Sequence, residues 1–172
     1  LTPLEGLVMG TRCGDIDPSI ILHIMGREEL TLSEANTLLN KHSGLQGLSG
    51  ISSDMRDRIS EMDKGNEQCR TAIEVYCYRL KKYIGAYAAA MGGIDALVFT
   101  AGVGENSPII RKLSCEGLEF LGLEVDDALN NSSDRGERLI SPQSARGKVL
   151  VIPTNEALVI ARHTERIVRE MK

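Results

Sequence analysis

The chain has few aromatic side chains: four Tyr, two Phe and no Trp among 172 residues. Its 20 Lys and Arg residues are outnumbered by 24 Asp and Glu residues, which gives a net charge of −4. Proteins that bind nucleic acid usually combine a basic face with aromatic rings on which bases stack. The composition therefore excludes nucleic acid as an expected partner.

Cysteine and long apolar runs are also scarce. The four cysteines are widely spaced, with no Cys-x-x-Cys pair and no histidine close enough to suggest a zinc site. No stretch is long and apolar enough to cross a bilayer, and no charged-then-apolar leader opens the chain. We therefore expect reduced thiols, no membrane partner and a cytoplasmic location. The chain opens at Leu1 without Met, so we expect it to be part of a longer protein.

What is present is the composition of a globular domain, with 42% hydrophobic and 26% charged residues. Capping signals and apolar periodicity predict several helices. They cover about ten residues from 18, then residues 32–43, 52–63, 66–91, 109–117 and 154–172. Gly44 is expected to end the second of these helices as a left-handed cap. The last helix is expected to be amphipathic, with Leu158, Ala161, Val168 and Met171 pointing inward. Apolar runs predict strands over 94–100, with both faces covered, and 149–152, and a short one within 118–125. We expect loops at 47–50 and 130–147. Strands separated by helices indicate an α/β fold.

The first strand is followed by Gly102-Val103-Gly104 and then by Glu105 and Asn106. Glycines in such a turn let the backbone approach a ligand closely. The third glycine of the dinucleotide fingerprint and the Gly-Lys-Ser/Thr of the P-loop are both missing, so neither of those sites is indicated. Nucleotide binding is the leading hypothesis, and an ordinary strand-to-helix turn is the alternative.

The second strand is followed by Thr154, Asn155 and Glu156. Ligands of open α/β sheets gather at the carboxyl ends of strands, so we expect both strand ends to line one cleft. Mg²⁺ takes few protein carboxylates and completes its shell with water and phosphate, so Glu156 alone is chemically adequate as a ligand. Alternatively, Glu156 complements the positive end of the terminal helix.

Two further segments carry suitable chemistry. Arg12 lies between Gly10 and Gly14, and a guanidinium matches the oxygens of a phosphoryl group. The spacing alone favours the alternative, a surface pair with Asp15 or Asp17. In the second segment, an aspartate could bind ribose hydroxyls and an arginine could lie on an adenine face, or the two could form a helix cap and a solvated charge. That segment is Asp54-Met55-Arg56.

Three stretches of the chain closely resemble the C-terminal half of the acetate kinase family in residue identity, order and spacing. They are residues 2–18, 98–106 and 152–156. The resemblance implies that residues 1–172 form the C-terminal, nucleotide-binding domain of a two-domain kinase. The implied fold is that of actin, sugar kinases and Hsp70, a ribonuclease H-like mixed sheet flanked by helices. It also implies an absent N-terminal domain that carries the acetate pocket and the remaining catalytic groups.

The resemblance assigns a role to each candidate residue. Arg12 stabilises the transferring phosphoryl group, and Glu156 is associated with Mg²⁺. The segments that contact ATP or ADP are Asp54, Met55 and Arg56, together with Gly102, Val103, Gly104, Glu105 and Asn106. Ala157 stands where a second glutamate is frequent in the family, and Cys13 where serine is also common.

The implied reaction is the reversible transfer of the γ-phosphoryl of ATP to acetate, which gives ADP and acetyl phosphate. We expect the 172-residue chain alone to be inactive and expect the protein to form a homodimer through this domain. A propionate or butyrate kinase would share these segments. A non-catalytic nucleotide-binding or dimerisation module is the other alternative, because the apolar seam of the longest helix could pair with a second copy.

Overall fold

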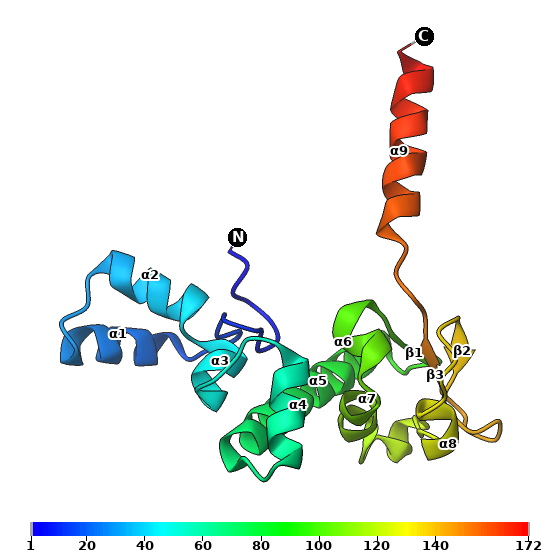
Figure 1. Cartoon of the computed structure of the whole chain (residues 1–172), viewed down its shortest axis with the longest axis horizontal. Coiled ribbons are helices and arrows are strands. Elements are labelled where there is room, and N and C mark those ends of the chain that lie inside the picture. The colour runs from blue at the N-terminus through cyan, green and yellow to red at the C-terminus, as the bar shows by residue number, and fades with distance from the viewer. Residues whose placement is uncertain (1, 172) are drawn as a thin grey trace. The chain divides into compact units, whose positions relative to one another are not determined.

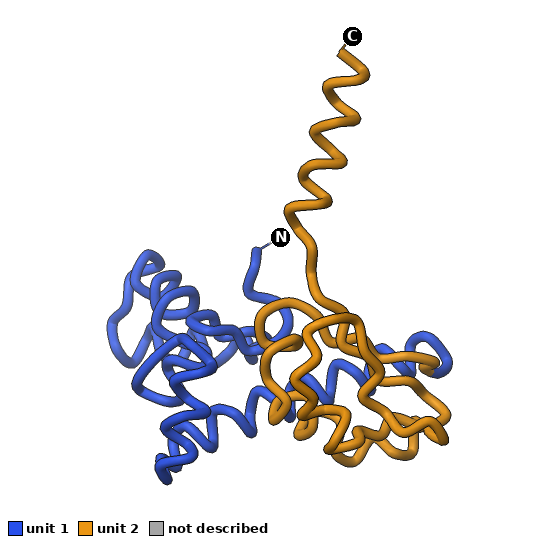
Figure 2. The backbone as a smooth tube through the Cα atoms, turned by 45° about the vertical axis from the view of Figure 1, so that its right-hand side comes forward, with its two compact units in different colours: residues 1–93 blue, residues 94–172 orange. Residues whose placement is uncertain are grey.

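The computed structural model describes residues 2–171, which fall into two compact units divided after Gly93 (Figure 2). The first unit is helical, and the second contains a small sheet. None of the described helices has the length and apolar character needed to span a membrane.

The first two helices of the first unit begin at predicted capping signals, and Figure 1 labels all helices of this unit. They are α1 (Pro18–Arg27), α2 (Leu32–Lys41), α3 (Gly44–Ser49), α4 (Met55–Asp63) and α5 (Glu67–Met91). Asp17 caps α1 by accepting a hydrogen bond from the Ser19 amide, and Thr31 and Glu34 form a reciprocal capping box at α2. Asn66 caps α5.

The long helix α5 ends as predicted at Gly92, whose φ of +76° is left-handed. The core of this unit forms where α3 and α4 pack against α5, with Leu45, Met55 and Ile73 buried there. The apolar seam predicted along α5 is only partly buried, because Tyr87 and Met91 at its C-terminal end are 61% and 65% exposed. Periodicity identifies the face of a helix but not how far its neighbours extend.

The loop predicted at 47–50 is wrong, because residues Gly44–Ser49 form helix α3. Gly44 was expected to end the preceding helix, but α2 ends with His42 as its C-cap, and Gly44 begins α3 with a φ of +64°. A Cβ at Gly44 would lie 2.3 Å from the Met9 carbonyl oxygen and 2.6 Å from that of Arg12. Gly44 is therefore needed because the loop at Met9–Arg12 passes too close for a side chain, and it does not end a helix.

The second unit is built on a three-stranded mixed sheet of order β1-β3-β2. Strand β1 (Ala96–Phe99) runs parallel to β3 (Lys148–Val151), with Phe99 opposite Val151, and β2 (Arg138–Leu139) is antiparallel to β3. The flanking helices are α6 (Ala101–Asn106), α7 (Pro108–Cys115), η1 (Glu119–Leu121), α8 (Asp127–Asn130) and α9 (Glu156–Glu170). The predicted α/β fold with a mixed sheet is confirmed.

Details of this unit differ from the sequence prediction. The strand expected within 118–125 is instead η1 followed by a single bridge between Leu123 and Gly147. The expected loop at 130–147 contributes β2 and the buried Ile140. Strand β1 is not covered on both faces, since Val98 is 46% exposed. An apolar run alone does not distinguish a central strand from an edge strand, and β1 is at an edge.

Helix α9 has the predicted amphipathic pattern but no buried residue. The side chains expected to point inward are open to solvent instead, as Leu158, Ala161, Val168 and Met171 are all exposed. Amphipathic spacing defines an apolar face, and no described element covers this one.

Candidate functional site

Arg12 lies on a loop whose backbone is held on both sides. The Cys13 amide donates to the Leu39 carbonyl at the end of α2, at 3.0 Å. On the other side, three amides at or next to the start of α3 donate to the loop's carbonyls. These bonds are Ser43 to Thr11 at 3.0 Å, Leu45 to Met9 at 2.9 Å and Gln46 to Gly10 at 2.9 Å. The backbone of the loop is therefore fixed to its neighbours by these four hydrogen bonds.

The Arg12 side chain is exposed and makes no hydrogen bond or ion pair with any residue in the described range 2–171. The surface pair that the spacing also permitted does not form. Asp17 caps α1 instead, and Asp15 accepts hydrogen bonds from the Gly6 amide and the Tyr83 hydroxyl. Arg12 is thus a cation free to bind an external anion.

The contacts of Asp15 were not apparent from the sequence. Tyr83 and Arg79 reach it from α5, with Arg79 donating to the Asp15 carbonyl at 2.5 Å. The hydroxyl of Tyr83 lowers the pKa of Asp15, and the same bond raises the pKa of Tyr83 to about 12. A separation of 68 residues gives no local signal for this pair. Together these contacts anchor the chain beyond Arg12 to the longest helix.

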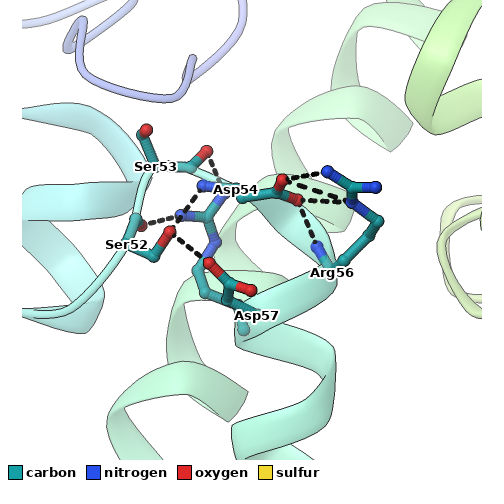
Figure 3. A network of polar contacts seen from close by, with 6 residues as sticks. Ser52, Ser53, Asp54, Arg56 and Asp57 are labelled. Carbon is teal, nitrogen blue, oxygen red and sulfur yellow. Dashed lines mark hydrogen bonds and ion pairs between the residues drawn. The ribbon is translucent and has the colours of Figure 1, made fainter.

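The Asp54–Arg56 segment forms the start of α4 (Figure 3). Asp54 accepts a hydrogen bond from the Arg56 amide at 2.8 Å and pairs with the Arg56 guanidinium at 2.6 Å. Met55 between them is buried in the core. The sequence is consistent with either a helix cap or a contact to a ligand at these residues. In the structure Asp54 caps α4, and the exposed Arg56 side chain is paired with Asp54.

Arg58 fixes the backbone just before this cap. Its side chain is buried and donates to the carbonyls of Ser52 and Ser53. Burial lowers the pKa of Arg58. The Ser53 carbonyl in turn lies 3.3 Å from where a Cβ on Gly10 would be. The Arg12 loop and the Asp54–Arg56 segment are therefore neighbours within the first unit.

The Asp54 carboxyl should titrate at a pH far below that of an ordinary aspartate. The Arg56 side chain, and next its amide, lower the pKa of Asp54 from 3.8 to about 2. A carboxyl whose pKa is depressed by folding stabilises the folded state above the unfolded pKa, and this is lost as pH falls toward 2. Carbon NMR titration should give a midpoint near 2 that rises toward 3.8 in Arg56→Ala. Lys64→Ala should leave it unchanged, and a wild-type midpoint near 3.8 would contradict the geometry.

In the second unit, the carboxyl ends of β1 and β3 are joined by side chains. The Glu105 carboxylate accepts the Thr154 amide and the Thr154 hydroxyl, both at 2.8 Å. Since that hydroxyl proton is committed to Glu105, Thr100 must be the donor in its 3.2 Å contact with the Thr154 oxygen. The Ala101 amide donates to the same oxygen at 3.0 Å. The two strand ends thus lie together, as the topology rule predicted.

These bonds give Glu105 a structural role that the sequence did not reveal. The Thr154 amide, followed by its hydroxyl, lowers the pKa of Glu105, so the carboxylate stays charged. Thr100 and Thr154 were not singled out as site residues. Their position directly after two predicted strands was the signal that could have identified them.

The Gly-x-Gly segment is the short helix α6, and its two glycines do different things. A Cβ on Gly104 would lie 3.3 Å from the Phe99 carbonyl carbon, so Gly104 allows α6 to pack on β1. A Cβ on Gly102 would meet nothing within 4 Å. Asn106 donates to the Gly102 carbonyl at 2.9 Å. Of the two glycines, only Gly102 leaves open backbone that a ligand can approach.

Glu156 is the first residue of α9, and its exposed carboxylate has no hydrogen bond to another described residue. Asn155 caps the helix by accepting from the Leu158 amide at 3.0 Å. Residues 2–171 contain no cluster of three or more His, Cys, Asp or Glu side chains that could enclose a metal ion. Glu156 therefore offers one carboxylate, beside the joined strand ends.

Comparison with known proteins agrees with this architecture. The sequence model of the Acetokinase family matches residues 1–162. The acetate kinase of Thermotoga maritima is 57% identical over 172 residues, which cover 99% of this chain and 43% of that protein. The crystal structure of Porphyromonas gingivalis acetate kinase matches with a TM-score of 0.92 at 46% identity, covering 97% of this chain and 42% of that one.

A propionate kinase from Francisella tularensis also matches, with a TM-score of 0.85 and 41% identity over 93% of this chain and 40% of its own. The fold is thus one shared by kinases named for short carboxylates. The chain belongs to the Acetokinase family. It spans about two fifths of the length of these relatives.

Proposed function

We propose that this chain is the C-terminal, nucleotide-binding domain of an enzyme that reversibly transfers the γ-phosphoryl of ATP to acetate, giving acetyl phosphate and ADP. The observation that carries the proposal is Arg12, an exposed guanidinium that pairs with no residue in the range 2–171 and lies on a loop held by backbone hydrogen bonds. Phosphoryl transfer depends mainly on positioning and charge neutralisation, and a planar guanidinium matches the oxygens of the transferring group. Its fixed backbone means that little order must be gained on binding.

Residues proposed to contact adenosine occur in both units, and each set is considered by itself. In the first, Asp54 and Arg56 hold each other at the surface, and the face of the Arg56 guanidinium can lie on an adenine ring. In the second, α6 presents the open backbone of Gly102 and the exposed side chain of Asn106. Met55, Gly104 and Glu105 support these surfaces from behind, through the core, the strand contact and the Thr154 bonds.

The residues present fit a magnesium ion bound mainly through water and phosphate. Glu156 offers one exposed carboxylate that no other described residue uses. Mg²⁺ keeps several waters and takes one or two carboxylates, so no denser cluster is needed. When bound, the ion would offset the charge of the β- and γ-phosphate oxygens. Glu156 would hold it by accepting hydrogen bonds from its water shell.

Calorimetry with Mg·ADP on the purified chain tests the nucleotide site. Asn106→Ala and Glu156→Ala should each weaken binding by about tenfold, the scale expected for losing one hydrogen bond to a charged group. Glu170→Ala changes a second exposed carboxylate on α9 and should bind like the wild type. Unchanged affinity in both site variants would refute the assignment.

The acyl acceptor and the absent domain require a longer protein. Because the matching structures include acetate and propionate kinases, an acceptor panel of acetate, propionate and butyrate on the full-length enzyme is needed to separate them. The 172-residue chain alone should not produce acetyl phosphate. Production at a full-length rate would overturn the proposal that a second domain supplies the acetate pocket.

The proposal includes a homodimer formed through this domain. Support comes from α5, where Tyr78, Tyr87 and Met91 are each more than 60% exposed. Large apolar side chains at this exposure are suited to a second copy of the chain. Sedimentation equilibrium of the purified chain would report the association directly.

A further inference from the structure

Arg111 is a buried cation with neutral partners. Its side chain is 1% exposed and lies on α7, directly after the α6 segment. Nε donates to the Asn130 side-chain oxygen at 2.7 Å, and Nη2 donates to the Asn130 carbonyl at 2.8 Å. Nη1 donates to the carbonyls of Gly104 and Glu105, at 2.8 and 2.9 Å. Burial, and next the nearby Arg138, lower the pKa of Arg111 to about 10.

The two carbonyls bound by Nη1 belong to the last turn of α6. Carbonyls in that position have no partner within the helix, and α6 is only six residues long. Arg111 therefore completes the C-terminal end of α6, while Thr154 binds the Ala101 amide at the other end. Asn130 is itself held, because its side-chain amide donates to the Pro108 carbonyl at 2.9 Å. The short helix is fixed at both ends.

Packing alone does not explain an arginine at this position. Burying a guanidinium without a carboxylate has a large desolvation cost, and an apolar side chain would fill the space without it. What an apolar side chain lacks is a rigid set of donors that can bind four oxygens at once. In the first unit, Arg58 contacts Ser52 and Ser53 in the same manner, just before the Asp54–Arg56 segment. A buried arginine that donates to backbone carbonyls thus lies beside each of the two segments proposed to contact adenosine.

We propose that Arg111 is a positioning residue for nucleotide binding, which holds the Gly102–Asn106 segment in its binding geometry through the carbonyls of Gly104 and Glu105. This inference rests on the proposed function, in which that segment contacts the nucleotide. Arg111 itself is buried and does not touch the ligand. Its effect on affinity passes through the shape and rigidity of α6.

The first test measures Mg·ADP affinity by calorimetry in Arg111→Ala, with and without low-millimolar guanidinium. We expect affinity to fall by about tenfold or more, because several charge-assisted bonds are lost together. Added guanidinium should restore part of it, whereas methylammonium should not. Arg111→Lys keeps the charge but not the planar donors and should remain weak. Arg135→Ala, which removes an exposed arginine of the same unit, should bind normally.

The second test measures amide hydrogen exchange without ligand. Arg111→Ala should accelerate exchange in residues 104–107 and leave β3 as protected as in the wild type. Equal loosening of β3 would show a general structural role and overturn the proposal. So would unchanged affinity in a folded Arg111→Ala.

If the wild-type chain does not bind Mg·ADP, the proposed function fails, and an unaffected α6 in the exchange experiment would then overturn the positioning role as well. If Arg111→Ala does not fold, Asn130→Ala removes one of the acceptors and should loosen α6 to a smaller extent, with no response to guanidinium. Wild-type exchange in Asn130→Ala would count against the inference.

Discussion

Replacing Arg12 with alanine in the full-length enzyme should lower kcat by a factor on the order of 10³ to 10⁵, the range for losing an arginine that stabilises a transferring phosphoryl group. The melting temperature should not change. The side chain is exposed and contacts no other described residue, while the loop is held by backbone bonds that alanine retains. The measurement is steady-state kinetics in both directions together with thermal unfolding.

Two variants make this result specific. Arg27→Ala removes another exposed arginine of the same unit, whose one ion pair among the described residues is with Glu28, and should leave kcat unchanged. Arg12→Lys keeps the charge but loses the planar donors and should recover only part of the rate. A kcat for Arg12→Ala within a few-fold of wild type would remove the main support for the proposed reaction.

Gly44→Ala should destabilise the first unit by at least about 2 kcal/mol, combining left-handed strain with a backbone clash. The new Cβ would lie 2.3 Å from the Met9 carbonyl oxygen, where no flexible side chain can move aside. Either α3 or the Arg12 loop must shift. Urea unfolding followed by helical circular dichroism measures the loss, and Gly44→Ala in the full-length enzyme should also be slower than wild type.

Gly26→Ala is the matched control. Gly26 lies inside α1, its φ is not left-handed, and a Cβ there meets nothing within 4 Å. Alanine favours a helix interior over glycine by up to about 1 kcal/mol, so this variant should be equal to the wild type or more stable. If both variants had the same stability as wild type, the tight contact at Gly44 would be refuted.

The features that the sequence predicted correctly are those with a local cause. Asp17 and the Thr31–Glu34 pair bind amides within three residues of themselves, so their spacing alone identifies them. The meeting of the carboxyl ends of β1 and β3 follows from a topology rule for parallel strands. Neither prediction required knowledge of individual side-chain contacts.

The features that were missed depend on partners distant in sequence. Nothing near Tyr83 indicates that its hydroxyl reaches Asp15, and a buried arginine such as Arg111 looks like a surface charge in a helical pattern. Gly44 was misassigned because a left-handed glycine is most common after a helix, whereas here a passing loop requires it. Packing between segments decides these cases.

The bare apolar face of α9 has a thermodynamic consequence for the chain as it stands. With no buried residue, the helix relies on the Asn155 cap, the Glu165–Arg169 pair and its own backbone bonds. Fifteen-residue helices with only such support sit near the midpoint of the helix–coil equilibrium in water. Its helical content should therefore fade gradually on warming, ahead of and separate from the cooperative melting of the sheet.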